Sequence, residues 1–235
     1  MAVTRASTDG SGSDDPVADR VQAAYDAVAR DYDREFGDEL DVKPLDRALL
    51  TALAELVGNG TIADVGCGPG HVTRYLAAQH GDVLGVDLST AMIAIARERA
   101  PQLTFTAGSM LELPVADAEW AGVVSLYSII HLTVTERLTA YREFARVIQP
   151  GGWLLIAFHV DSFEFTTGEV NHITNWFSRP VDLDGYFLDP DEVATQLAAA
   201  GFTVIAKMDR QPAPEVEYPS RRCYLLLQRH PRDKT

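Results

Sequence analysis

From residue 61 onwards, short apolar segments alternate with amphipathic helices, and this alternation constrains the fold more than any other feature. The helices are predicted to begin near Gly70, near Ser89 and at Thr133, where Glu136 completes a capping box. Apolar strands that alternate with helices are typical of a parallel sheet that is covered on both faces. The predicted strands span residues 61–65, 83–87, 103–107, 122–127 and 153–158.

The C-terminal part continues this pattern with a change of direction. A helix is predicted from Asp189-Pro190 to Gly201, and two strands are predicted over 202–208 and 222–228. The connection between these strands is too short to hold a helix. We therefore expect the last strand to run antiparallel to its predecessor.

Other segments flank or interrupt the alternation. Residues 1–14 are mainly Ser, Thr, Asp and Gly with little to bury, so we expect a flexible tail before a single domain over 15–235. Residues 17–57 show the spacing of two amphipathic helices. Residues 159–188 are rich in aromatic side chains, have no sustained period and are too long for an ordinary loop. We predict that 17–57 and 159–188 form a lid over the carboxyl edge of the sheet.

The composition excludes several classes of partner. The chain carries 34 acidic and 20 basic residues, for a net charge of −14, which argues against a nucleic acid or an anionic membrane. Its longest apolar stretches, such as 153–158, are far shorter than the ~20 residues of a membrane span. Cys67 and Cys223 show no disulfide or metal spacing, and no apolar leader follows Met1, so we expect a cytoplasmic protein.

The most informative motif runs from Asp64 to Gly70, where a strand enters a glycine turn that opens a helix. Glycines let the backbone approach a ligand, and the helix start offers unpaired N–H groups. A tight strand-to-helix turn by itself also favours glycine, so the loop alone does not define the ligand. NAD and S-adenosylmethionine are the two candidates. The spacing is G-x-G-x-G with His71 in the sixth position, whereas the NAD fingerprint is G-x-G-x-x-G.

Four motifs in register resemble those of class I S-adenosylmethionine-dependent methyltransferases. The similarity begins with the loop at 64–70 and continues at 84–89 with Met92, at 105–110 followed by 113–114, and at 148–152. It covers roughly residues 60–160. The resemblance implies an α/β, Rossmann-like, doubly wound sheet of seven strands, mostly parallel, with the last strand antiparallel. It also implies methyl transfer to an oxygen, nitrogen or carbon atom of a small molecule, by a monomer or homodimer.

The resemblance also implies individual cofactor contacts. Asp64 would lie near the ammonium of the methionine moiety, and Asp87 would accept both ribose hydroxyls. Ser109 departs from the family pattern, because many relatives have Asp there. Asp87 as a helix cap and Met92 as a core residue are the competing interpretations. The predicted cofactor-binding residues are Tyr32, Asp64, Gly66, Cys67, Gly68, Gly70, His71, Asp87, Leu88, Met92, Gly108, Ser109, Met110, Ser125 and Tyr127.

Methyl transfer from a sulfonium has a neutral leaving group, so positioning should dominate catalysis, with a base assisting a hydroxyl or amine acceptor. His131, just after the fourth strand, is the first candidate base, although it also has the position of a histidine that only binds a loop. His159 and His172, with Glu169, are the second candidates.

No metal is expected, because the fourth strand ends in Tyr127-Ser128 rather than in carboxylates. The aromatic residues of 159–188 favour an apolar or planar acceptor, or else form a hydrophobic cluster under a long loop. The alternative functions are a non-catalytic protein that binds the adenosyl cofactor and, less favoured, an NAD-linked oxidoreductase.

Overall fold

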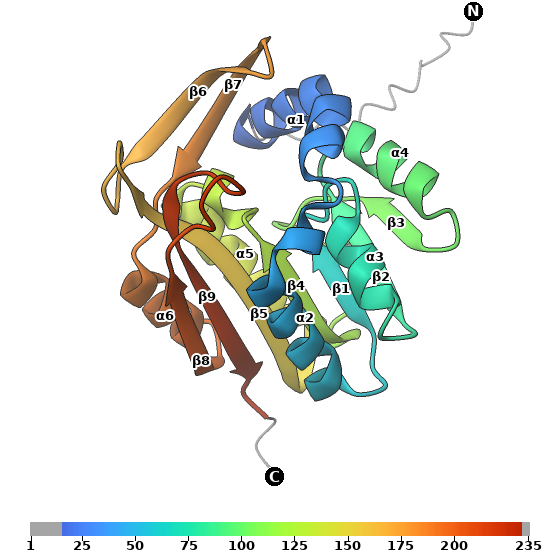
Figure 1. The fold of residues 1–235 in the computed structure, drawn as a ribbon. Coiled ribbons are helices and arrows are strands. Elements are labelled where there is room, and N and C mark those ends of the chain that lie inside the picture. The colour runs from blue at the N-terminus through green and yellow to red at the C-terminus, as the bar shows by residue number, and fades with distance from the viewer. Residues whose placement is uncertain (1–15, 232–235) are drawn as a thin grey trace, which may run out of the picture.

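The computed structural model describes residues 16–231 and contains a seven-stranded sheet in the order β3-β2-β1-β4-β5-β9-β8 (Figure 1). The predicted tail at 1–14 lies outside the described residues. Strand β9 is antiparallel to β5 and β8, whereas β3, β2, β1, β4 and β5 are parallel to one another, which confirms the predicted sheet. The strands are β1 Ile62–Val65, β2 Val83–Asp87, β3 Thr104–Ala107, β4 Trp120–Leu126, β5 Ile148–Ser162, β8 Phe202–Arg210 and β9 Ser220–Arg229.

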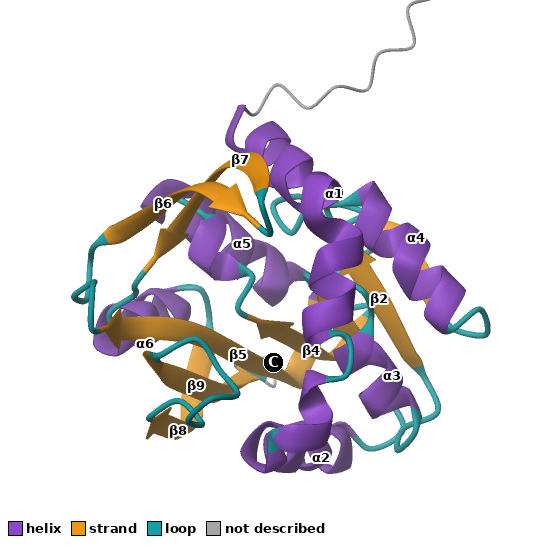
Figure 2. Cartoon of the chain, turned by 45° about the horizontal axis from the view of Figure 1, so that its top comes forward, coloured by secondary structure: helices purple, strands orange, loops and turns teal. Residues whose placement is uncertain are grey.

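Helices cover both faces of this sheet (Figures 1 and 2). They are α1 Pro16–Phe36, α2 Pro44–Val57, α3 His71–Ala77, α4 Thr90–Arg99, α5 Val134–Val147 and α6 Pro190–Ala199, with short 3-10 helices η1 Glu39–Val42 and η2 Ile129–His131. The predicted capping box of Thr133 and Glu136 is present, and the Asp189 carboxylate caps α6. None of the helices within 16–231 is long and apolar enough to cross a membrane.

The core consists of two main layers of buried side chains, one on each face of the sheet. Phe144 of α5 and Leu197 of α6 pack on one face, and Leu53 of α2 and Leu76 of α3 pack on the other. All four are fully buried, and each contributes roughly 1.5–3 kcal/mol of transfer free energy. Since α2 belongs to the core, the lid predicted over 17–57 is too long: α1 reaches across the carboxyl edge, and Glu39 and Lys43 line cavities there.

The second predicted lid segment folds into a β-hairpin, so the expectation of an irregular stretch at 159–188 is wrong. The β5 strand continues to Ser162, and β6 Val170–Trp176 pairs with β7 Arg179–Tyr186. The tight turn consists of Phe177 and Ser178, whose φ angles are 51° and 60°. A turn of this kind normally contains Asn or Gly, and this turn contains neither, so its sequence carries no hairpin signal.

The hairpin lies beside α1 and is attached to it by charges and aromatic rings (Figure 2). Arg20 of α1 is 3.0 Å from Asp182, and Arg179 is 2.7 Å from Asp31 of α1. The Trp176 ring lies edge-on to Tyr25, with ring centroids 5.6 Å apart. Together, α1 and the hairpin cover the end of the sheet at which parallel α/β folds bind ligands.

Candidate active site

The loop between β1 and α3 depends on its glycines. Gly66, Gly68 and Gly70 have φ angles of 81°, 52° and 79°, which side chains rarely allow. A Cβ atom on Gly66 would lie 2.4 Å from the Cβ of Ser128, and one on Gly70 would lie 2.9 Å from the Phe105 ring. The loop backbone therefore stays open to a ligand and packs closely against the following elements.

Asp87 lies at the end of β2 with both carboxylate oxygens in place. One oxygen accepts the N–H of Gly68 at 2.7 Å and the other accepts the N–H of Ser89 at 2.8 Å. The helix cap is Ser89 itself, whose hydroxyl accepts the N–H of Met92. Burial raises the pKa of Asp87 to about 6, although the two backbone hydrogen bonds oppose this shift. Each oxygen retains a free lone pair for a ligand hydroxyl.

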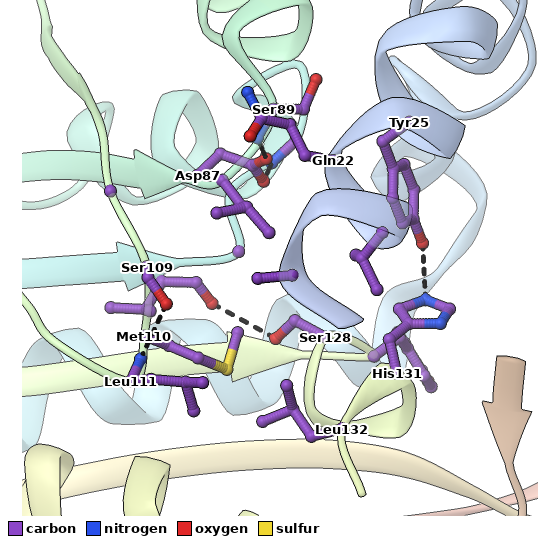
Figure 3. A pocket seen from close by; sticks show the side chains of 18 of the residues that line it. Gln22, Tyr25, Asp87, Ser89, Ser109, Met110, Leu111, Ser128, His131 and Leu132 are labelled. Carbon is purple, nitrogen blue, oxygen red and sulfur yellow. Dashed lines mark hydrogen bonds between the residues drawn. The ribbon is translucent and has the colours of Figure 1, made fainter. Parts of the chain in front are cut away.

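Asp87 faces a first cavity, the loop cavity, which is closed on the opposite side by α1 (Figure 3). Figure 3 shows Asp87 and Ser89 on one side, Met110 and Leu111 below them, and Tyr25 above His131. Of the predicted cofactor residues, the following line this cavity: Tyr32, Gly66, Gly68, Asp87, Leu88, Gly108, Ser109, Met110 and Tyr127. The loop cavity thus brings together predicted residues that lie at or after the ends of strands β1, β2, β3 and β4.

A small inner cavity adjoins the loop cavity on the other side of Gly66 and Gly68. Asp64 lines it, is 2% exposed and accepts a 2.6 Å hydrogen bond from the Thr73 hydroxyl. Burial raises the pKa of Asp64 to about 6. His71 also lines this cavity, and its Nε2 is 3.2 Å from the Glu39 carboxylate. Its buried Nδ1 has no partner within residues 16–231.

Three predicted cofactor residues line none of the three cavities, and Cys67 lines only the inner one. Met92 is buried between α1 and α4 and lines none of the three cavities, so it is the core residue of the competing interpretation. Ser125 is buried and shares a 2.6 Å hydrogen bond with Ser128. Gly70 caps α3 and lies outside the cavities. Cys67 lines the inner cavity with its thiol near the Gly68 carbonyl.

A third space, the aromatic cavity, has a volume of about 350 Å³ and shares Tyr25, Tyr32, Tyr127 and His131 with the loop cavity. Its volume falls within the range of ordinary small-molecule sites, ~300–1,000 Å³. Its rings come from α1, the residue after β4, η2, β5, the hairpin with the residue that follows it, and the loop before β9, namely Tyr25, Tyr32, Phe36, Tyr127, His131, His159, Trp176, Tyr186, Phe187 and Tyr218. Such a lining suits a planar, largely apolar molecule.

His131 lies at the boundary of the loop and aromatic cavities, and its neighbours fix its tautomer. Its Nδ1 is 2.7 Å from the backbone carbonyl of Asp184, which can only accept, so Nδ1 carries the hydrogen. The Nε2 lone pair therefore accepts the hydroxyl of Tyr25, also at 2.7 Å (Figure 3). Burial lowers the pKa of His131, so the ring is neutral at neutral pH and has one basic nitrogen.

Of the second-choice candidate bases, His159 lies at the site, whereas His172 and Glu169 do not. His159 lines the aromatic cavity, stacks on Tyr127 and bonds the Ser220 hydroxyl through Nδ1 at 2.6 Å. Burial, with the charge of Arg222 next, lowers the pKa of His159 to about 3. His172 projects from the outer side of β6 to Asp184, and Glu169 bonds its own turn, so the structure brings neither to the site.

Sequence reasoning missed the polar residues at the base of the aromatic cavity. Lys43, Glu217 and Arg222 line it from three separate segments, and no shared motif links them. It also missed Gln22, which faces the loop cavity from α1 (Figure 3). The helical spacing of the Tyr residues indicated the face of α1 that carries Gln22, but it gave no signal for that residue.

Comparison with known proteins agrees with this geometry. Residues 62–152 match the family model described as a methyltransferase domain. A 2-phytyl-1,4-naphtoquinone methyltransferase from Thermosynechococcus vestitus is 30% identical over 165 residues, which cover 67% of this chain and 71% of that protein. An uncharacterized methyltransferase from Oceanobacillus iheyensis is 32% identical over 123 residues, 52% of this chain and 57% of the relative. The chain belongs to the class I S-adenosylmethionine-dependent methyltransferase family.

The same fold occurs in solved structures. The [4+2]-cyclase SpnF superimposes with a TM-score of 0.71 and 18% identity, and the match covers 92% of this chain and 98% of the other. This similarity concerns the fold alone. The fold therefore does not by itself define the reaction, which the site residues must decide.

Proposed function

We propose that the protein transfers a methyl group from S-adenosylmethionine to an oxygen, nitrogen or carbon nucleophile of a small planar molecule held in the aromatic cavity. One observation carries this proposal. The loop cavity and the aromatic cavity share a wall at Tyr25, Tyr32, Tyr127 and His131. Ligands in the two cavities would meet at this wall, beside a histidine with an available basic nitrogen.

The residues of the loop and inner cavities fit the cofactor. Asp87 would accept the ribose hydroxyls through its remaining lone pairs, and Asp64 would face the ammonium group. The unpartnered Nδ1 of His71 offers a hydrogen-bonding atom in the inner cavity for the cofactor carboxylate. When bound, the cofactor supplies a methyl group on a sulfonium, whose carbon–sulfur bond breaks as the bond to the acceptor forms.

His131 would take the proton that the acceptor loses. Its Nε2 is the basic atom, and an acceptor hydroxyl would replace the Tyr25 hydroxyl there. The hydrogen bond from Nδ1 to the Asp184 carbonyl would hold the ring in position and stabilise the imidazolium. A base positioned in this way contributes typically ~10²–10⁴-fold to the rate.

The cofactor assignment is tested by calorimetric titration with S-adenosylmethionine, S-adenosylhomocysteine and NAD. Both adenosyl ligands should bind the wild type and bind Asp87→Asn far more weakly. Asp117→Asn, which changes an exposed carboxylate on Arg146, is the matched control and should bind like the wild type. Binding of NAD instead, or of none of the three, would refute the proposal.

Catalysis is tested by product formation with a panel of planar phenols. We expect S-adenosylhomocysteine and a methylated phenol, and a His131→Ala variant that binds the cofactor normally but turns over at least ~10²-fold more slowly. Unchanged turnover in that variant would exclude His131 as the base.

A second function is a protein that binds the cofactor without transferring the methyl group. It is favoured by one observation: Tyr25 already occupies the Nε2 lone pair of His131. Tight cofactor binding with no S-adenosylhomocysteine formed on any planar acceptor would support it. Membership in the methyltransferase family leaves no support for the NAD-linked alternative.

Composition supports the remaining parts of the proposal. The net charge of −14 agrees with a small-molecule partner rather than a nucleic acid or a membrane. We infer a cytoplasmic location from Cys67 and Cys223, which are both free thiols. We infer a monomer or a homodimer, which size-exclusion chromatography with light scattering would distinguish.

A further inference from the structure

A network of buried charges forms the base of the aromatic cavity. Lys43 and Arg222 line the cavity, and both contact Glu217, at 3.3 and 3.5 Å. Glu217 has no exposed side-chain surface and also binds Arg210 at 2.6 Å. Burial opposes ionisation of Glu217, but Arg210 and the other cations outweigh it and lower the pKa of Glu217 to about 2. Glu217 is therefore ionised at neutral pH, and this end of the cavity contains charged groups.

The charges in this network balance. Its cations are Lys43, Arg210 and Arg222, and its anions are Glu39, Asp46 and Glu217. An acceptor with a carboxylate would add an uncompensated negative charge to a buried site, which is costly. A neutral oxygen brings no such charge and can still accept a hydrogen bond.

Arg222 has a hydrogen-bond donor to spare. The residue is 3% exposed, and its two terminal nitrogens donate to the backbone carbonyls of Ser220 at 2.8 Å and Tyr218 at 3.0 Å. Its Nε is buried and has no partner among the described residues. The backbone thus fixes the guanidinium, which also lies over the Tyr127 ring at 5.8 Å. The guanidinium carries five N–H groups, and its contacts with Ser220, Tyr218 and Glu217 use three of them, so it can still donate to an oxygen that the protein chain does not provide.

The aromatic cavity extends from His131 to Arg222, because both residues line it. We propose that the acceptor is a planar aromatic alcohol that also carries a neutral carbonyl oxygen, a hydroxyaryl ketone, and that Arg222 binds this carbonyl while the hydroxyl lies at His131. This inference rests on the proposed function and names its substrate class. The rings select for a planar molecule, and the balanced charges select for the neutral oxygen.

The test compares three probes that share one ring system and differ at one position. The protein, saturated with S-adenosylhomocysteine, is titrated with 6-acetyl-2-naphthol, 6-ethyl-2-naphthol and 6-hydroxy-2-naphthoic acid. The ketone should bind about tenfold or more tightly than the ethyl compound, the gain expected of a hydrogen bond to a charged group. It should also bind more tightly than the carboxylate. Equal binding of ketone and ethyl compound, or tightest binding of the carboxylate, would overturn the inference.

A substitution tests whether Arg222 causes the preference for the ketone over the ethyl compound. Arg222→Met keeps much of the length but removes the donor, and it should lose the preference for the ketone while still binding the ethyl compound. Arg221→Met is the matched control, because Arg221 is partly exposed and pairs with Asp161. It should keep the preference. A ketone preference that survives in Arg222→Met would refute the role of Arg222, and the wild-type probe comparison decides the inference if that variant does not fold.

The outcomes separate this inference from the proposed function. If S-adenosylhomocysteine binds but none of the three naphthalenes does, the acceptor class is wrong while the methyltransferase proposal stands. If S-adenosylhomocysteine itself fails to bind, the proposed function is refuted and the inference is refuted with it.

Discussion

Cofactor binding should weaken about tenfold between about pH 7.5 and about pH 5, because Asp64 has to be ionised to meet an ammonium group. Burial raises the pKa of Asp64 to about 6, although the hydrogen bond from Thr73 opposes this. At about pH 5, roughly a tenth of the free molecules have an ionised Asp64. If the ammonium returns the pKa to the ordinary 3.8 or below, the bound carboxylate stays ionised. The difference in affinity is then ~1.4 kcal/mol.

The raised pKa of Asp64 also affects the stability of the protein without cofactor. A carboxyl group with a raised pKa destabilises the fold as the pH rises from about 4 to about 6, because the folded state then holds a proton that the unfolded state has lost. Ionised Asp64 is therefore an unfavourable buried charge in the free protein, and the ammonium would compensate it.

The assay is calorimetric titration with S-adenosylhomocysteine at both pH values, in pairs of buffers with different ionisation enthalpies. Near pH 5, Asp64 should release close to one proton on binding, by the arithmetic above. Asp64→Asn should bind more weakly at both pH values and lose this proton release. Asp87, whose pKa burial also raises to about 6, is measured separately through Asp87→Asn. Wild-type affinity that is the same at both pH values would refute the reasoning.

Three further changes test the fold around the site. Gly66→Ala should destabilise the protein by at least ~1–2 kcal/mol and abolish cofactor binding, since its φ is 81° and the new Cβ meets Ser128; thermal denaturation and titration measure both. Ser178→Gly should relieve about 1 kcal/mol of strain at the hairpin turn and slow hydrogen exchange in β6 and β7; faster exchange would contradict this. Glu217→Gln should cost ~3–5 kcal/mol in denaturant unfolding because it leaves Arg210 buried and under-compensated, and an unchanged midpoint would exclude this role.

The central strands of the sheet, such as β1 and β4, could be predicted because they are buried on both faces and read as contiguous apolar runs. The glycine loop could be placed because the turn needs positive φ angles at Gly66, Gly68 and Gly70. The place of His131 at the site could be predicted from the topology. It follows the strand next to β1, so the topology brings it to the same edge as the loop.

The hairpin and the base of the aromatic cavity could not be predicted, for physical reasons. Strand β6 has Asn171 and Ile173 on its cavity side and His172 on its outer side, so polarity does not alternate along it. Its turn uses Phe177 and Ser178 in place of Asn and Gly. Arg222 sits on a buried strand, and Glu217, which compensates its charge, lies in the preceding loop without a motif that links the two residues.

Tyr32 of α1 lines the loop, inner and aromatic cavities, and this shared wall has a thermodynamic consequence. Any movement of its ring that suits one ligand changes the surface offered to the other. The two binding equilibria are then coupled, and reciprocity requires that the cofactor alter the affinity for the acceptor by the same factor as the acceptor alters that for the cofactor. Substituting Tyr32 with Leu should reduce both factors together, and by equal amounts.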